Sequence, residues 1–266
     1  MKVGVSTASL FLRYDNEDAV HILDGLGVEV AEVFLTSFSE YKPSFARILK
    51  NEMGSLKAHS VHILNSQLEP QIFNRHHRVK ADCYAALAEV MESANVLGAK
   101  YYTFHGGARF KKASRDPSND NFDRIGESIG EAYDFCKKYG VELCLENVEW
   151  STYNRPGVFA EMKCRIPNLK GVLDVKQARI SGFPCEEYLE EMGKDIVTVH
   201  LSDVKEDGKM CLPGKGIFDF ETLIKRLSAV GFDGPLLIEA YKDDYTKVEE
   251  LKHACEYLQE ILYKIE

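Results

Sequence analysis

The sequence lacks several features that would place it in common functional classes. It has seven cysteines in 266 residues but no C-x-x-C pair, and the number is odd, which argues against a zinc ribbon or a disulfide framework. It has no run of five basic residues, and 42 acidic residues outnumber 33 basic ones, for a net charge of −9. Such a chain repels a phosphate backbone unless a local basic patch attracts it. We therefore expect no nucleic-acid partner.

Long hydrophobic runs are also missing. No stretch approaches the ~18 apolar residues of a membrane span, so we expect no membrane partner. The segment Met1 to Val5 is typical of a strand and not of a signal peptide. Several cysteines lie in apolar patterns, such as Cys144 in VELCLEN, and are expected to be small core residues. These features predict a reducing, cytoplasmic compartment.

Short apolar runs alternate along the chain with longer amphipathic segments. The expected strands are 2–6, 30–35, 56–61, 100–104, 141–145, 171–173, 196–199 and 235–238. Helical patterns lie between them, and three end at a typical stop residue: Gly98, Gly140 or Gly231. Parallel strands need crossover helices, and eight such units close into a barrel. The competing doubly wound sheet carries a glycine-rich fingerprint after its first strand. The motif is absent here, so we predict a single (β/α)₈ barrel domain over residues 1–266.

Six consecutive expected strands end at a residue type that binds metals. These residues are His59, His105, Glu146, Asp174, His200 and Glu239. In a barrel of this kind the carboxyl ends of the strands meet at one mouth, where active sites lie. Carboxylates and imidazoles that converge there need neutralising, and a divalent cation does this.

The last four residues of this series, Glu146, Asp174, His200 and Glu239, form an oxygen-rich ligand set. It suits one Mn²⁺, Zn²⁺, Co²⁺ or Mg²⁺ ion that could act as a Lewis acid on a carbonyl. His59 and His105 could bind a second metal that shares Glu146, or could instead bind substrate or a ligating carboxylate.

Other residues near the expected mouth allow two interpretations. His62 either lines the mouth and contacts substrate or packs within a loop, and Trp150 either stacks on a sugar ring or caps the core. Five basic residues could contact a phosphate or could be ordinary surface charges: Arg109, Arg155, Lys176, Lys205 and Lys215.

The sequence resembles the xylose isomerase-like TIM barrel superfamily over essentially its whole length. This group includes sugar isomerases, ketose 3-epimerases, hydroxypyruvate isomerases, inosose dehydratases and endonuclease IV-type repair enzymes. The motifs that carry the resemblance are His59-Ser60…Asn65, Phe104-His105-Gly106-Gly107, Leu145-Glu146-Asn147, Gly171-Val172-Leu173-Asp174, His200-Leu201-Ser202-Asp203, Leu212-Pro213-Gly214-Lys215-Gly216 and Leu237-Ile238-Glu239.

The resemblance implies roles for individual residues. In epimerase-like members, two glutamates, an aspartate and a histidine hold one metal, and the two glutamates also move protons. By position these are Glu146, Asp174, His200 and Glu239, with Glu146 and Glu239 catalytic. The superfamily often has a histidine three residues after the aspartate. Gln177 stands there; it can bind a substrate hydroxyl but is a poor metal ligand.

Further departures bear on the choice of reaction. The repair nucleases carry an Asp-x-His where this chain has Lys209 and Cys211, so a third metal lacks its expected ligands. Ketose epimerases usually carry an arginine soon after the strand-seven histidine, where this chain reads Val204-Lys205-Glu206. The substrate could therefore differ from an ordinary free ketose.

The leading prediction is a metal-dependent isomerase or epimerase of a sugar or sugar phosphate, acting by proton transfer through a metal-stabilised enediolate. The alternatives are an endonuclease IV-like phosphodiesterase, an inosose dehydratase-like enzyme and a non-catalytic sugar-binding barrel. The chain could form a homo-oligomer.

Overall fold

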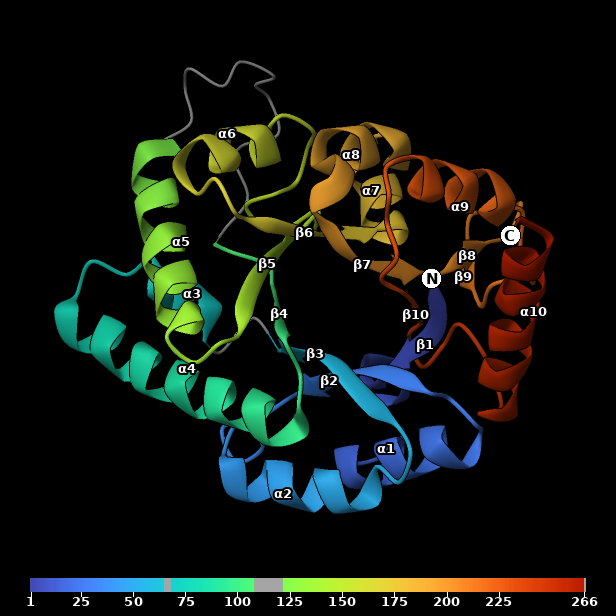
Figure 1. Cartoon of the computed structure of the whole chain (residues 1–266), viewed down its shortest axis with the longest axis horizontal. Coiled ribbons are helices and arrows are strands. Elements are labelled where there is room, and N and C mark those ends of the chain that lie inside the picture. The colour runs from blue at the N-terminus through green and yellow to red at the C-terminus, as the bar shows by residue number, and fades with distance from the viewer. Residues whose placement is uncertain (65–67, 108–121, 266) are drawn as a thin grey trace.

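A computed structural model describes residues 1–64, 68–107 and 122–265, so Asn65 and Arg109 lie outside the described residues. Eight parallel strands close into a barrel in the order β1-β10-β7-β6-β5-β4-β3-β2 (Figure 1). The barrel strands are β1 (Lys2–Ser6), β2 (Val30–Leu35), β3 (Lys57–Ile63), β4 (Tyr101–Phe104), β5 (Glu142–Glu146), β6 (Lys170–Asp174), β7 (Ile196–Leu201) and β10 (Pro235–Ile238). The predicted (β/α)₈ barrel is confirmed.

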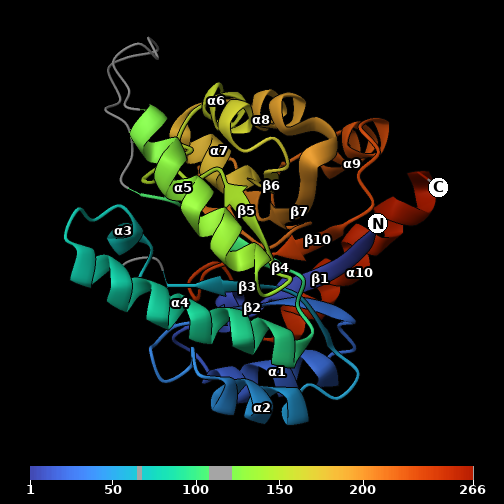
Figure 2. The same ribbon diagram turned by 60° about the vertical axis from the view of Figure 1, so that its left-hand side comes forward.

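Helices surround the barrel and connect successive strands (Figures 1 and 2). They are α1 (Asn16–Gly25), α2 (Pro43–Glu52), α3 (Glu69–Ile72), α4 (His77–Leu97), α5 (Phe122–Lys137), α6 (Val158–Arg165), α7 (Val175–Ser181), α8 (Cys185–Met192), α9 (Phe220–Ala229) and α10 (Glu249–Ile265), with 3₁₀ turns η1 (Thr7–Leu10) and η3 (Gly193–Asp195). As expected, α4 ends at Gly98, whose φ of 83° suits glycine. The sequence did not reveal the short helices α3 and α7.

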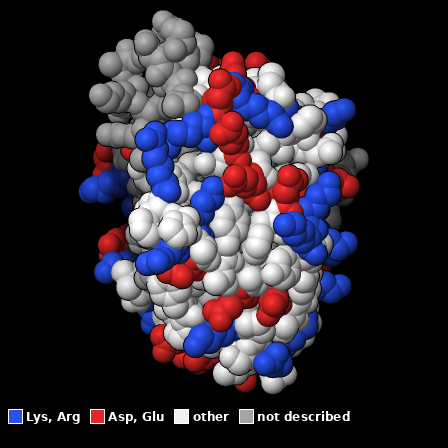
Figure 3. Space-filling model, turned by 90° about the vertical axis from the view of Figure 1, so that its left-hand side faces the viewer, with Lys and Arg blue, Asp and Glu red and all other residues white. Residues whose placement is uncertain are grey.

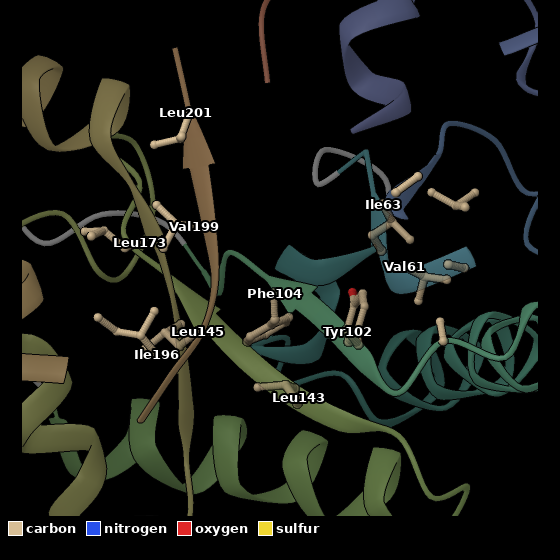
Figure 4. Packing of buried hydrophobic residues seen from close by; sticks show 14 of the residues in the cluster. Val61, Ile63, Tyr102, Phe104, Leu143, Leu145, Leu173, Ile196, Val199 and Leu201 are labelled. Atoms are coloured by element: carbon tan, nitrogen blue, oxygen red, sulfur yellow. The ribbon is translucent and has the colours of Figure 1, made fainter. Parts of the chain in front are cut away.

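Side chains alternate between the two faces of the barrel wall. One set is apolar and packs outward against the helices, as Tyr102, Phe104, Leu143 and Leu145 do (Figure 4). The other set points into the barrel and is largely polar: Glu32, Ser60, His62, Thr103, Glu146, Thr198 and His200 are all buried. Because side chains on a strand alternate between its two faces, strands that are mostly apolar can still place polar side chains inside the barrel.

An irregularity in β3 changes which of its residues face inward. Ala58 pairs with Ala31 and Ser60 with Glu32, so His59 is an extra residue in the ladder. Such a bulge lets two consecutive side chains point the same way. His59 and Ser60 both face the interior, and His59 Nε2 lies 3.2 Å from the carbonyl oxygen of Val197 near the start of β7.

A small two-stranded sheet follows β7 and shapes one side of the mouth. It pairs β8 (Asp203–Val204) with β9 (Met210–Cys211). The Asp203 carboxylate accepts hydrogen bonds from the backbone N–H groups of Val204, Gly214, Gly216 and Phe218. One buried carboxylate therefore fixes the conformation of the whole 212–218 loop.

The surface and the cysteines agree with the expectations from composition. On the face shown in Figure 3, Lys and Arg side chains are interspersed with Asp and Glu, with no broad area of one sign. All seven cysteines are free thiols. Within the described part of the chain, no helix combines the length and apolar character needed to cross a bilayer.

An ion-pair cluster outside the barrel gives a pH-dependent stability prediction. Asp195 lies 2.7 Å from Lys163 and 2.9 Å from Lys170. Burial alone would raise the pKa of Asp195, but the two ammonium groups lower it. Since the folded-state pKa lies below the unfolded value, this stabilisation is present above about pH 4 and is lost as the pH falls through the folded-state value.

We therefore expect Asp195→Asn to lower the free energy of unfolding by about 1 kcal/mol at pH 7, with a smaller loss at pH 3. Urea unfolding at both pH values tests this. Asp207→Asn is the matched control, because Asp207 forms an exposed pair with Lys209. An equal loss from Asp195→Asn at both pH values would contradict the ion-pair explanation.

Candidate active site

Four buried side chains converge at the carboxyl ends of β5, β6, β7 and β10. Glu146 and Asp174 end their strands, His200 is the next-to-last residue of β7, and Glu239 follows β10 directly. His200 Nδ1 lies 2.9 Å from Glu146 Oε1 and 3.1 Å from Glu239 Oε2. The register explains this convergence, because Asp174 pairs with His200 and Leu237 pairs with His200 from the other side.

Asp174 is held in place by its neighbours on β5 and α7. The Asn147 amide donates to the Asp174 carbonyl, and the Asp174 N–H donates to the Asn147 side chain, both at 2.8 Å. Asp174 also caps α7, since its Oδ1 accepts from the Gln177 N–H at 2.8 Å. The Gln177 side chain accepts from the Glu149 N–H at 3.3 Å. Gln177 therefore bridges two loops beside the site.

A buried glutamate from β2 connects the histidines of the site. Glu32 is completely buried. Its Oε1 lies 3.0 Å from His62 Nδ1 and 3.1 Å from His200 Nε2. Its Oε2 accepts hydrogen bonds from Ser60 and Thr103, at 2.7 and 2.5 Å. Glu32 thus orients two imidazoles whose other ring nitrogens face the remaining site residues.

His62 and His105 form a second group of possible ligands. Their Nε2 atoms are 2.8 Å apart, and His105 Nε2 lies 3.5 Å from Glu146 Oε2. His105 Nδ1 lies 3.0 Å from the buried carboxylate of Glu69 on α3. Two ring nitrogens this close repel unless a proton or a cation lies between them.

Burial and mutual charge shift the pKa values of these groups. Burial raises the pKa of Asp174 to about 7, with Glu146 and Glu239 adding to the effect and Lys176 opposing it. Burial alone would lower the pKa of His62, but Glu32 outweighs it and the pKa rises to about 9. The same competition raises the pKa of His200 well above its usual value. Groups perturbed in this way are typical of functional sites.

The donor atoms of the site suit a metal ion. Three groups, each with all ligand atoms within 4.8 Å of one another, are Glu146–Asp174–His200, Glu32–His200–Glu239 and His62–His105–Glu146. Among the described residues, Glu146 Oε2 and Glu239 Oε2 are buried and accept no hydrogen bond, and their nearest histidine nitrogens lie 3.5 Å and 3.1 Å away. Buried carboxylate oxygens that accept no hydrogen bond are costly, and a divalent cation would satisfy them. The residues present fit such an ion.

An apolar cavity of about 420 Å³ opens above these residues. Its walls include Phe11, Phe34, Trp150 and Tyr241, and its polar groups include His62, His105 and Glu239. The Trp150 ring is 42% exposed and lies 4.9 Å from the His105 ring, centre to centre. Trp150 and His62 therefore both lie in the wall of this cavity.

The placement of His59 requires a correction. The sequence put it at the end of its strand, but β3 continues to Ile63, and His59 lies near the strand starts. It borders a separate cavity with residues such as Gly234 and Pro235. The bulge and the two extra strand residues account for the difference. His62 takes the position that was expected for His59.

The basic residues named from the sequence differ in their surroundings. Lys205 and Lys215 are exposed, whereas Lys176 is almost completely buried beside Asp174. Glu32 and Glu69 were not predicted. Glu32 could have been found, because it is a glutamate inside the apolar run VAEVFL. No sequence pattern indicated Glu69, because it lies on a helix of only four residues.

Comparison with known families agrees with the barrel fold. The family model described as "Xylose isomerase-like TIM barrel" matches residues 21–261. The chain belongs to this family.

Relatives and structural neighbours give the family-level context. An inosose isomerase from Bacillus velezensis is 23% identical over 76% of this chain and 77% of its own length. An uncharacterised protein from Methanocaldococcus jannaschii is 27% identical over 75% of this chain and 71% of its own. A D-tagatose 3-epimerase-like protein superposes with a TM-score of 0.79 at 21% identity, covering 100% of this chain and 98% of the other. The IOLI protein with a bound zinc atom gives 0.75 at 18% identity, covering 100% and 98%.

Proposed function

We propose that this chain is a divalent-metal-dependent isomerase or epimerase of a sugar or sugar phosphate. The observation that carries the proposal is the pair of buried carboxylates, Glu146 and Glu239, which face His200 Nδ1 from two sides. Similarity to sugar epimerases and to inosose isomerase supports the same reaction class.

The proposed ligands are Glu146, Asp174, His200 and Glu239. This set of three carboxylates and one imidazole accommodates Mn²⁺, Zn²⁺, Co²⁺ or Mg²⁺. When bound, the ion would polarise the substrate carbonyl and stabilise negative charge on the adjoining oxygens. Glu32 would keep the His200 ring oriented from the opposite nitrogen, as carboxylates beside metal-binding histidines commonly do.

The two glutamates would carry the protons. One carboxylate removes the proton from the carbon next to the carbonyl, and the other returns a proton from the opposite side of the planar enediolate. Trp150 and the phenylalanines of the cavity would pack on the apolar face of the sugar and exclude water. Gln177 would hold the loop after β5, and its amide N–H groups would be available to a substrate hydroxyl.

A second ion could bind to His62, His105 and Glu146. Both imidazoles turn Nδ1 toward a carboxylate, Glu32 or Glu69, so both Nε2 atoms face Glu146. This arrangement also gives the phosphodiesterase alternative its best support. Against a three-metal nuclease site, Lys209 is exposed and paired with Asp207, and Gln177 replaces the expected histidine.

Metal content and hydrogen exchange together test the proposal. We expect protein purified without chelator to hold about one divalent ion per chain, and Glu146→Gln/Glu239→Gln to lose it. We also expect incubation of the loaded wild type with candidate ketoses and ketose phosphates in D₂O to place deuterium next to the carbonyl. No ion after reloading, or no exchange with any candidate, would count against the proposal, whereas two or more zinc ions and cleavage of abasic DNA would favour the phosphodiesterase.

A further inference from the structure

One buried cation beside the site has no role in the chemistry described above. Lys176 is the second residue of α7, two positions after Asp174, and its side chain is only 2% exposed. Its ammonium group lies 3.7 Å from the centre of the Tyr241 ring. Among the described residues, no acceptor forms a hydrogen bond with its Nζ.

A buried ammonium group with three donors and no acceptor is unfavourable unless negative charge lies close by. Lys176 lies two residues after Asp174, and Tyr241 lies two residues after Glu239, so the contact between the ammonium group and the Tyr241 ring places Lys176 at the ends of β6 and β10, where these two carboxylates supply negative charge. The electron-rich face of Tyr241 stabilises the cation further. Lys176 is therefore a buried positive charge near two proposed metal ligands, over the face of a ring that also lines the cavity.

The charges buried around Lys176 are mostly negative. Five carboxylates, Glu32, Glu69, Glu146, Asp174 and Glu239, are buried in and beside the site, and three imidazoles, His62, His105 and His200, lie among them. Without Lys176 the metal-free site would hold a larger excess of negative charge in a poorly solvated interior. Lys176 lowers that excess before any ion binds, and it repels the ion once bound.

We propose that Lys176 is a built-in counter-charge that stabilises the metal-free site and weakens the binding of the divalent ion. This inference rests on the proposed metal centre. Its consequence is a protein that folds before metal loading and exchanges its ion more readily than the four-ligand set alone would allow. Lys176 is thus a positioning residue that acts through Asp174 and Glu239.

The test compares Lys176→Met with the wild-type protein in two measurements. Mn²⁺ binding is measured from the electron paramagnetic resonance signal of free Mn²⁺, and thermal unfolding is measured with and without the ion. We expect Lys176→Met to bind Mn²⁺ at least tenfold more tightly and to unfold at a lower temperature when metal-free, so that the ion raises its unfolding temperature more than it does for the wild type. Lys176→Arg keeps the charge and should stay within about threefold of the wild-type Kd. Lys215→Met is the control for an exposed lysine near the mouth.

Lys176→Gln provides a second neutral variant, whose amide can still donate to the carboxylates, in case Lys176→Met does not fold. Unchanged Mn²⁺ affinity with equal losses of stability in both metal states would show that Lys176 only packs, and would overturn the inference. Weaker binding would overturn it as well. Zn²⁺ is measured in parallel by competition with a chromophoric chelator. If the wild type binds neither ion, the proposed metal centre and the proposed role of Lys176 are both wrong. If the wild type binds an ion and the neutral variants bind it equally well, only the proposed role of Lys176 is wrong.

Discussion

Glu239→Gln is expected to lower kcat on the true substrate by about a thousandfold, the loss typical of removing a positioned acid or base. Glutamine keeps the size of the side chain and can still occupy a ligand position, but it cannot accept a proton. Since Glu239 is also a proposed ligand, metal content must be measured on the same preparation. Turnover restored by excess Mn²⁺ would show that Glu239 serves only to hold the ion.

The two carboxylates can be separated by hydrogen exchange. If Glu146 and Glu239 act on opposite faces of the intermediate, each single glutamine variant should lose interconversion but still exchange solvent deuterium into one of the two isomers. The two variants should label different isomers. Glu206→Gln is the matched control, because Glu206 is exposed on the loop after β8. Exchange lost for both isomers in both variants would contradict a division of labour between the two faces.

The second large effect is expected at Glu32. Glu32→Gln should lower the free energy of unfolding by about 3–5 kcal/mol, because it leaves His62 and His200 without their shared buried counter-ion. It should also weaken metal binding about 10- to 100-fold, the usual cost of losing a carboxylate that orients a ligating histidine. Urea unfolding and Mn²⁺ titration measure the two effects.

Glu142→Gln is a fitting control for Glu32→Gln. Glu142 is also a glutamate of a barrel strand, but its side-chain contact with the Tyr133 hydroxyl is long, at 3.5 Å. We expect little change in metal affinity there. If Glu32→Gln destabilised the fold and left metal affinity unchanged, Glu32 would be a structural residue with no part in orienting His200.

The sequence predicted the barrel well because each strand leaves a local pattern. β1, β2 and β10 have the predicted bounds, and the residues at the ends of β5, β6, β7 and β10 converge as expected. A residue that directly follows an apolar run can be located without tertiary information, since parallel strands all end at one mouth. This explains why Glu146, Asp174, His200 and Glu239 were found together.

The sequence failed where position depends on pairing between strands. The bulge at His59 exists only relative to β2, so the predicted strand ended at Val61 and His59 was assigned to the mouth in place of His62. Glu69 was not predicted, and Lys176 was named only as a possible phosphate contact or surface charge, for a similar reason. Both residues are buried because they lie on short helices that pack on the strand ends. A helix of four or seven residues is too short to show a hydrophobic period in the sequence.

The closing of the barrel has a consequence for how the chain folds during synthesis. β1 pairs with β2 on one side and with β10 on the other, and Lys2 lies opposite Pro235. One edge of β1 therefore stays unpaired during synthesis until β10, more than 200 residues later in the sequence, has left the ribosome. Unpaired strand edges invite pairing with other chains, and contacts so distant in sequence form slowly. Pairing of β10 thus covers the free edge of β1, and the same step brings Glu239 to the site.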